Sequence, residues 1–267
     1  MTKHAGKRIF ILLGSAAALA AGCSSAPNGG GMGGNGGSTG AATCPTNATA
    51  KLSDFQMGTG IDSVDGRMGG WYFYGDPLGM YDPPKVDGVA PPADTTQGSP
   101  CSPAGSLRLK GTGFTGFGAG LGTNFVMPTG TVKNTYDASK YSGIIFYAKG
   151  ATSIMHVQVK AVDWNTDPEV AAPKCMLTMN GDPKNCSPYL VKFDDLGKPI
   201  TTEWKQFKVA FADMAQDQYN TGYIPTPAGV DKAHLTSFQI QINANFGASP
   251  PPTANNFEIW IDDVYFY

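Results

Sequence analysis

The sequence is poor in charged residues and has almost no histidine. Only 15% of its 267 residues are Asp, Glu, Lys or Arg, and the formal net charge is −2. A nucleic-acid-binding domain usually presents a basic patch, so this balance gives that class no support. Beyond the amino-terminal segment described below, the histidines are His156 and His234, which are too few for a histidine-rich zinc site.

Long helical periodicity and a second long apolar run are also missing. The chain contains 35 Gly and 20 Pro, a composition that suits short strands and turns rather than long helices. After the first 22 residues, no apolar segment is long enough to cross a bilayer. These absences point to an all-β domain of ordinary size.

The amino terminus has the pattern of an export signal. Three basic residues precede the apolar run 9–21, so residues 1–22 are interpreted as a signal peptide. The five residues that end at Cys23 (LAAGC) resemble a bacterial lipobox. That resemblance implies cleavage before Cys23 and a lipid on Cys23, and Ser24 is compatible with transport to the outer membrane. An ordinary secretory signal with an incidental cysteine is the alternative.

A linker follows the lipobox. Residues 23–42 are mostly Gly, Ser, Asn and Ala, so they have little apolar surface to bury and are expected to form a flexible tether. Its root-mean-square reach is about 25 Å. The remaining residues, 43–267, are expected to form one domain, held at the cell surface by the lipid anchor.

Four cysteines remain in this domain, an even number that suits an exported protein. Cys175 and Cys186 flank the turn sequence NGDP, which predicts a local disulfide between them and leaves Cys44 to pair with Cys101. A four-cysteine metal site is the competing interpretation, but it lacks a Cys-x-x-Cys pair.

The closing stretch 257–267 is the strongest strand signal. Its apolar residues alternate, and the pair Asp262-Asp263 interrupts the alternation, as a β-bulge would. A terminal strand this apolar must be paired inside a sheet. Together with further strands, it predicts an antiparallel β-sandwich, most simply a jelly roll with long loops and little helix. Those further strands are expected at 52–55, 107–110, 118–127, 143–148, 154–162, 189–193, 203–211 and 236–244.

Alternation also assigns faces to two of these strands. Val157 and Val159 should face the core, as should Phe238, Ile240 and Ile242 in the later strand. The opposite sets are polar: His156, Gln158 and Lys160 in one strand, and Gln239, Gln241 and Asn243 in the other. Amides both donate and accept hydrogen bonds, which recognition of sugar hydroxyls requires. An ordinary solvated sheet face is the alternative.

Catalytic motifs are weak. The string Gly111-x-Gly113-x-x-Gly116 matches a dinucleotide fingerprint, but no helix follows it, and no Gly-x-Ser-x-Gly sequence is present. The glutamates after the signal are Glu169, Glu203 and Glu258, and none lies in a recognisable hydrolase motif. A polysaccharide hydrolase or lyase that uses paired carboxylates therefore remains an alternative.

Several phrases together resemble one family, and they occur in order along residues 50–267. The phrases are WYFYGD at 71–76, GAGLG at 118–122, YDASKYSGI at 136–144, VDWNT at 162–166, EWKQF at 203–207 and IWIDDV at 259–264, with the cysteine pair between the fourth and the fifth. They resemble the galactose-binding-domain-like jelly rolls that serve as carbohydrate-binding modules in secreted bacterial polysaccharide-degrading systems.

The resemblance implies a monomeric, non-catalytic module that binds polysaccharide by aromatic stacking and hydroxyl hydrogen bonds. Loop position makes Trp71, Tyr74, Tyr81 and Trp164 the candidate ligand-stacking rings, and Asp163, Gln158 and Gln241 are the candidate polar contacts. Tyr219 and Tyr223 are second-rank candidates, whereas Trp204 and Trp260 are expected to pack on the sheet. Each loop ring has the alternative role of anchoring its loop.

The same resemblance implies a structural calcium ion between the first and last strands. The matching oxygen ligands would come from Asp54 and from Asp262 or Asp263. Gln56 departs from the pattern, because a second acid commonly stands there. The alternative is that Asp262 caps the bulge by accepting backbone N–H groups. A protein-binding adhesion or scaffold module remains a further alternative to the carbohydrate interpretation, since fold does not fix function.

Overall fold

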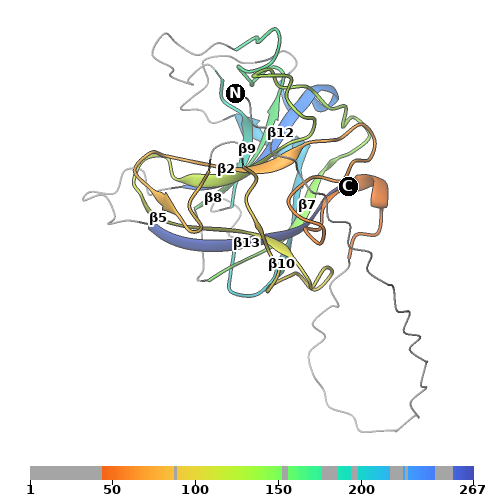
Figure 1. Cartoon of the computed structure of the whole chain (residues 1–267). Helices are drawn as coiled ribbons and strands as arrows, with labels where there is room; N and C mark the ends of the chain where they lie inside the picture. Colours follow the sequence, from red (N-terminus) through yellow and green to blue (C-terminus); the bar gives the residue numbers. More distant parts are fainter. Residues whose placement is uncertain are drawn as a thin grey trace, which may run out of the picture. The chain divides into compact units, whose positions relative to one another are not determined.

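Two antiparallel sheets pack face to face in this protein (Figure 1). The computed structural model describes residues 44–86, 89–151, 156–175, 186–193, 198–216, 225, 228–243 and 255–267. Within these ranges the only helical elements are single 3₁₀ turns, at Ala48–Ala50, Phe211–Asp213 and Lys232–His234. The predicted all-β sandwich is therefore confirmed.

The first sheet has the strand order β10-β7-β13-β5-β3, with β1 paired to β13 and β4 paired to β5. Its strands are β1 (Lys51–Ser53), β3 (Met80–Tyr81), β4 (Ala93–Asp94), β5 (Ser106–Phe114), β7 (Gly143–Gly150), β10 (Lys205–Ala210) and β13 (Asn255–Phe266). We call it sheet A.

The second sheet has the order β11-β9-β8-β12-β6-β2. Its strands are β2 (Gly70–Gly75), β6 (Ala119–Asn124), β8 (Val157–Asp163), β9 (Tyr189–Lys192), β11 (Ala215–Gln216) and β12 (Leu235–Ile242). We call it sheet B. β2 lies at one end of this order, and Gly60 forms an isolated bridge with Gly70 at its start.

β13 is the central strand that the sequence predicts. It lies between β7 and β5, so the last residues of the chain close sheet A from within. The bulge is also present, because the register with β7 shifts between Asp262 and Tyr265, and Asp263 has a φ of 47°. The extra residue restores the inward direction, and Val264 and Phe266 return to the core.

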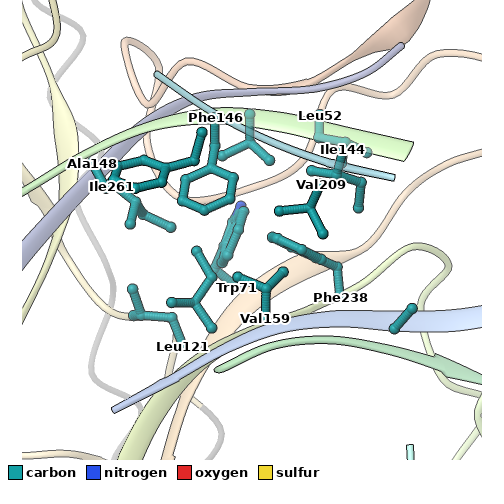
Figure 2. Close-up of a cluster of buried hydrophobic side chains, with 14 of the residues drawn as sticks. Leu52, Trp71, Leu121, Ile144, Phe146, Ala148, Val159, Val209, Phe238 and Ile261 are labelled. Atoms are coloured by element: carbon teal, nitrogen blue, oxygen red, sulfur yellow. The ribbon is translucent and has the colours of Figure 1, made fainter. Parts of the chain in front are cut away.

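The core fills the space between the sheets with aromatic and branched side chains (Figure 2). Phe146 of β7 stacks on Phe207 at 5.6 Å and meets Phe238 of sheet B edge-on at 6.1 Å between ring centroids. The predicted inward residues of β8 and β12, such as Val159 and Ile240, are buried. Alternation therefore assigned these two strands to the correct faces.

Two disulfides join Cys44 to Cys101 and Cys175 to Cys186, which confirms both predicted pairings. In the described ranges, no helix has the length and hydropathy needed to cross a membrane. The predicted signal peptide, lipobox cysteine and linker lie outside the described residues, and so do Tyr219 and Tyr223.

Candidate functional site

The outer face of sheet B carries two aligned rows of side chains. One row runs across five strands through Tyr72, Gly122, Gln239, Lys160 and Leu190, and the next runs through Tyr74, Gly120, Gln241, Gln158 and Lys192. We call the side chains of these two rows the polar sheet face. The register of four strand pairs thus places residues up to 121 positions apart in sequence beside one another, as with Gly120 and Gln241.

Two tyrosine rings lie across β6 at one end of this face. A Cβ added to Gly122 would come within 2.4 Å of Tyr72 Cζ, and one added to Gly120 would come within 2.5 Å of Tyr74 Cζ. The rings therefore occupy the space that side chains of β6 would otherwise fill. Their centroids are 6.2 Å apart, at an interplanar angle of 49°, and both residues are half-buried.

Gln241 connects the second row through all four hydrogen-bonding positions of its amide. Its Oε1 accepts from Tyr74 Oη at 3.4 Å and from Lys160 Nζ at 2.5 Å. Its Nε2 donates to the Phe117 carbonyl at 3.0 Å and to Asn243 Oδ1 at 2.6 Å. An amide with two donated and two accepted bonds is fully satisfied, so Gln241 fixes the positions of Tyr74 and Lys160.

Gln239 has the corresponding place in the first row. Its Nε2 donates to Tyr72 Oη at 3.3 Å. Burial raises the pKa of the Tyr72 phenol, and it raises the pKa of the Tyr74 phenol well above the usual range. Both phenols therefore stay neutral, and each keeps a hydroxyl that can donate and accept.

This arrangement suits an uncharged, hydroxyl-rich ligand. Half-buried aromatic rings provide apolar surface for the C–H faces of a sugar, and adjacent amides and hydroxyls serve its polar edges. In the described part of the chain, the outward residues of the two rows include no carboxylate. The positive charge comes from Lys160 and Lys192.

Of the predicted site residues, Tyr74, Gln158 and Gln241 lie together on this face. Gln158 and Gln241 are only 8% and 6% exposed, and the bonds of Gln241 to Tyr74 and Lys160 give it a positioning role. Tyr72, Gln239 and Lys160 are more accessible, and the prediction did not select them. The signal that could have found Tyr72 is strand alternation, since residues 72 and 74 share a face whereas residues 71 and 74 cannot.

Trp71 is not a rim residue, and that prediction is wrong. It is 2% exposed and lies between the sheets among side chains that include Phe146, Val159 and Phe238 (Figure 2). Its Nε1 donates to Ser53 Oγ at 2.9 Å, which satisfies the one polar group of the indole. On β2, Trp71 and Phe73 form the inward set, so Trp71 belongs to the core.

Tyr81 also serves the core rather than a ligand. Its ring stacks on Phe73 at 5.6 Å and meets Phe114 edge-on at 5.0 Å. Its hydroxyl is buried and has no hydrogen-bond partner among the described residues. The alternative role of a loop anchor therefore fits Tyr81 better than a ligand-stacking role.

Trp164 and Asp163 hold a turn at the end of β8. Trp164 Nε1 donates to the Ala172 carbonyl at 2.9 Å, while Lys174 Nζ lies 5.5 Å from the ring centroid and His234 packs against the ring edge-on. Asp163 is fully buried and accepts from the backbone N–H groups of Thr166 and Asp231. Burial raises the pKa of Asp163. The prediction that Asp163 contacts ligand is therefore wrong, because it faces inward.

The predicted calcium ligands each have protein partners. Lys51 Nζ lies 2.7 Å from Asp54 Oδ2 and 3.0 Å from Asp62 Oδ2, and although burial opposes it, these hydrogen bonds raise the pKa of Lys51. The ammonium thus supplies positive charge beside Asp54. No group of three or more His, Cys, Asp or Glu side chains in the described ranges is arranged to hold a metal ion.

Asp262 and Asp263 accept hydrogen bonds from the segment that contains Cys101. Asp262 Oδ2 accepts from the Ser99 N–H at 2.8 Å, and Asp262 Oδ1 accepts from the Asp263 N–H at 2.7 Å. Asp263 accepts from the Ser99 hydroxyl and, at 2.7 Å, from the Ser102 hydroxyl. Burial raises the pKa of Asp262 to about 8 and also raises that of Asp263. The two hydrogen bonds that Asp262 accepts from backbone N–H groups match the alternative in which this residue caps the bulge.

The three glutamates are dispersed rather than gathered at the polar sheet face. Glu258 pairs with Arg108 at 2.6 Å on sheet A, and Glu169 pairs with Lys133 at 2.8 Å. Glu203 is exposed just before β10. No observation among the described residues thus favours the paired-carboxylate alternative at this face.

No protein-family profile matches the sequence, and no curated protein matches it. Among solved structures, the fold is similar to that of a family 11 carbohydrate-binding module from Clostridium thermocellum in complex with a β-1,3-1,4-mixed-linked tetrasaccharide, with 14% identity and a TM-score of 0.41 over 81% of this chain and 94% of that one. A family 30 carbohydrate-binding module matches with 16% identity and a TM-score of 0.46, over 81% and 86% of the two chains. An exo-β-agarase matches with 10% identity and a TM-score of 0.43, over 82% of this chain and 25% of the agarase.

Proposed function

We propose that this protein binds a polysaccharide through the polar sheet face, without chemistry of its own. The observation that carries the proposal is the pair of tyrosine rings over Gly120 and Gly122, beside rows of amide side chains. Glycine at both positions lets the rings lie against β6, where they present apolar surface beside their own hydroxyls. The four bonds of Gln241 hold one ring and the Lys160 ammonium in place before any ligand arrives.

The sugar chain is proposed to lie across the strands, along the direction of the two rows. Successive residues of the polymer would then meet first a tyrosine and afterwards an amide and an ammonium group. Tyr72, Tyr74, Gln239 and Lys160 are the proposed contact residues, and Gln158 and Gln241 support them from below. Such a shallow, sequentially arranged surface suits the middle of a polymer as well as its end.

Affinity electrophoresis of the purified protein through gels that contain a panel of neutral and acidic polysaccharides tests this proposal. We expect retardation by at least one polymer, and weaker retardation for Tyr74→Ala than for the wild type. Lys174→Ala is a matched control, because Lys174 lies beside Trp164 and away from the two rows. Absence of retardation by every polymer, or equal retardation of Tyr74→Ala, would contradict the proposal.

We further propose that the protein is exported and anchored by a lipid on Cys23. The support is the sequence alone, namely the basic and apolar residues of 1–22 followed by LAAGC. Detergent phase partitioning of the expressed full chain tests it, with Cys23→Ser beside the wild type. The wild type should enter the detergent phase and Cys23→Ser should enter the aqueous phase, whereas identical partitioning would rule out the anchor.

A further inference from the structure

A cleft of about 630 Å³ adjoins the Tyr72 end of the polar sheet face. It is lined by residues 70–73 of β2 and by Asn124 of β6, and Gly70 and Asn124 are neighbours in the sheet register. Loop residues that are mostly proline and valine, together with Met127, form the rest of its lining. The volume is within the range of about 300–1,000 Å³ that is typical of small-molecule pockets.

The residues that line this cleft are mostly apolar, with Lys85 as the charged residue among them, and several are open to solvent. Val86, Val89 and Met127 are 58%, 64% and 56% exposed, and five prolines stand beside them. Large side chains of this kind gain free energy when a ligand covers them, because apolar surface leaves water. Several of them around one concave space indicate a binding site rather than scattered surface residues.

Asn124 carries the outward side of β6 from the polar sheet face to the cleft. Asn124 Oδ1 is buried and has no hydrogen-bond partner in the part of the chain that the structure describes. A fully buried atom is out of reach of a ligand in the cleft, so Asn124 borders the cleft through its other atoms. Asn124 follows Gly120 and Gly122 along the outward side of β6, so it lies next to the tyrosine rings.

Tyr72 belongs to both regions, since it lies in the first row of the polar sheet face and also lines the cleft. A ligand that occupies both must therefore combine hydroxyl-rich surface with an apolar group. A plain polysaccharide supplies only the first property. A polysaccharide esterified with acyl groups supplies both on adjacent atoms.

We infer that the cleft takes an apolar ester substituent, aliphatic or aromatic, on a sugar of the bound polysaccharide. The inference rests on the proposed function and deepens it by naming the substrate class. The substituted sugar lies against Tyr72, and its acyl group packs against the prolines and valines of the walls. A loop of a protein partner could also pack against these apolar residues, but it would have no use for the polar sheet face beside them.

The test compares one retarding polysaccharide in three forms: de-esterified with alkali, partially acetylated, and partially benzoylated. Affinity for the benzoylated form should exceed that for the de-esterified form about tenfold, because the larger acyl group removes more apolar surface from water. In Val89→Asn the ratio of the two affinities should fall to about one. Leu78→Asn is the matched control, because Leu78 is 69% exposed, as accessible as Val89, and lies outside the cleft. Its ratio should equal that of the wild type.

Equal affinity of the wild type for all three forms, or a ratio that survives Val89→Asn, would overturn the inference. A second arm keeps it separate from the proposed function. Saturation-transfer NMR with a benzoylated methyl glycoside should show transfer to the aryl protons in the wild type and in Tyr74→Ala, and none in Val89→Asn. Absence of transfer in the wild type would refute the cleft inference, whereas failure of every unesterified polymer to bind would refute the proposed function.

Discussion

The two outer faces of the sandwich differ in what packs against their aromatic rings. On sheet A, Lys149 Nζ lies 5.2 Å from the ring centroid of Trp204 and 5.1 Å from that of Trp260, and Trp260 is only 6% exposed. On sheet B, the rings are tyrosines that lie over glycines and remain half-buried. Lys149 and Arg108 thus lie against Trp260, which is buried, whereas Trp204 and the two tyrosines are half-buried.

The segment that contains Cys101 accounts for much of this difference. Trp260 Nε1 donates to Asp94 Oδ2 at 2.8 Å, Lys149 bonds to Gln97, and Ser99 and Ser102 bond to the two aspartates of the bulge. Residues 94–102 thus cover part of sheet A, and Cys44 fixes that segment to the start of the domain. Ring type alone therefore does not identify a ligand-binding face. The residues that pack against a ring determine whether a ligand can reach it.

The largest loss of stability should come from truncating Trp71, which was predicted to lie at a ligand-binding rim but is buried. Trp71→Ala should lower the free energy of unfolding by about 3–5 kcal/mol, because it leaves a cavity between the sheets and removes the partner of Ser53 Oγ. Urea unfolding followed by circular dichroism measures it. Trp204→Ala is the comparison variant, with an expected loss of about 1 kcal/mol or less. If Trp71→Ala kept the stability of the wild type and lost only ligand affinity, Trp71 would contact ligand and would not be a core residue.

Removing the disulfide that fixes the covering segment should have the next largest effect. The double variant Cys44→Ser, Cys101→Ser should lose about 2–4 kcal/mol of stability, since the unfolded chain is no longer constrained. Polysaccharide affinity should persist, because the covered face is not the binding face. Loss of affinity in a double variant that is still folded would mean that sheet A takes part in binding.

The pH dependence of stability should reveal the buried carboxylates of the bulge. The pKa of Asp262 is raised to about 8 in the folded state by burial, above an unfolded value of about 3.9. Between these values the folded protein binds more protons than the unfolded chain, so stability should fall as pH rises from about 4 to about 8. Asp263 adds to the same slope, since its pKa is also raised.

Asp262→Asn should make that slope shallower, because it removes one of the two carboxyls. Urea midpoints at pH 5, 6, 7 and 8 for both proteins provide the measurement. An unchanged slope in Asp262→Asn would show that this carboxyl is ionised in the folded protein, with its pKa in the ordinary range.

The smallest effect should come from displacing the Tyr72 ring without removing it. Gly122→Ala places a methyl group 2.4 Å from Tyr72 Cζ and so should push the ring aside, with an expected loss of affinity of about tenfold and little change in stability. Gly60→Ala is the matched control, because its Cβ would meet nothing within 4 Å. Equal polysaccharide affinities of the two variants would argue against a contact role for Tyr72.

Regular patterns made the sandwich predictable. The alternation in 257–267 and its interruption at Asp262-Asp263 define a central bulged strand, and the even number of cysteines with a turn between two of them defines the disulfides. Alternation also separated Gln158 and Gln241 from the core residues beside them. Each of these features depends on neighbouring residues in sequence or on simple pairing.

The site was harder to predict because its parts come from different strands. Which face of β2 becomes the core depends on its pairing with β6, and the sequence of β2 is aromatic on both faces. The role of Gly120 and Gly122 as floors for Tyr74 and Tyr72 appears only once the register is known. Likewise, the ammonium of Lys51 beside Asp54 and Asp62 depends on how the chain after β1 folds back, which local sequence does not define.

Isothermal titration calorimetry with the polysaccharide that retards the protein most strongly tests the central claim most directly. Three proteins are compared: the wild type, Tyr72→Ala on the polar sheet face, and Trp204→Ala on the opposite face. We expect Tyr72→Ala to bind the polysaccharide about tenfold more weakly than the wild type, or by about 1.4 kcal/mol, and Trp204→Ala to bind it with the affinity of the wild type. Weaker binding by Trp204→Ala with unchanged binding by Tyr72→Ala would contradict it and move the site to sheet A.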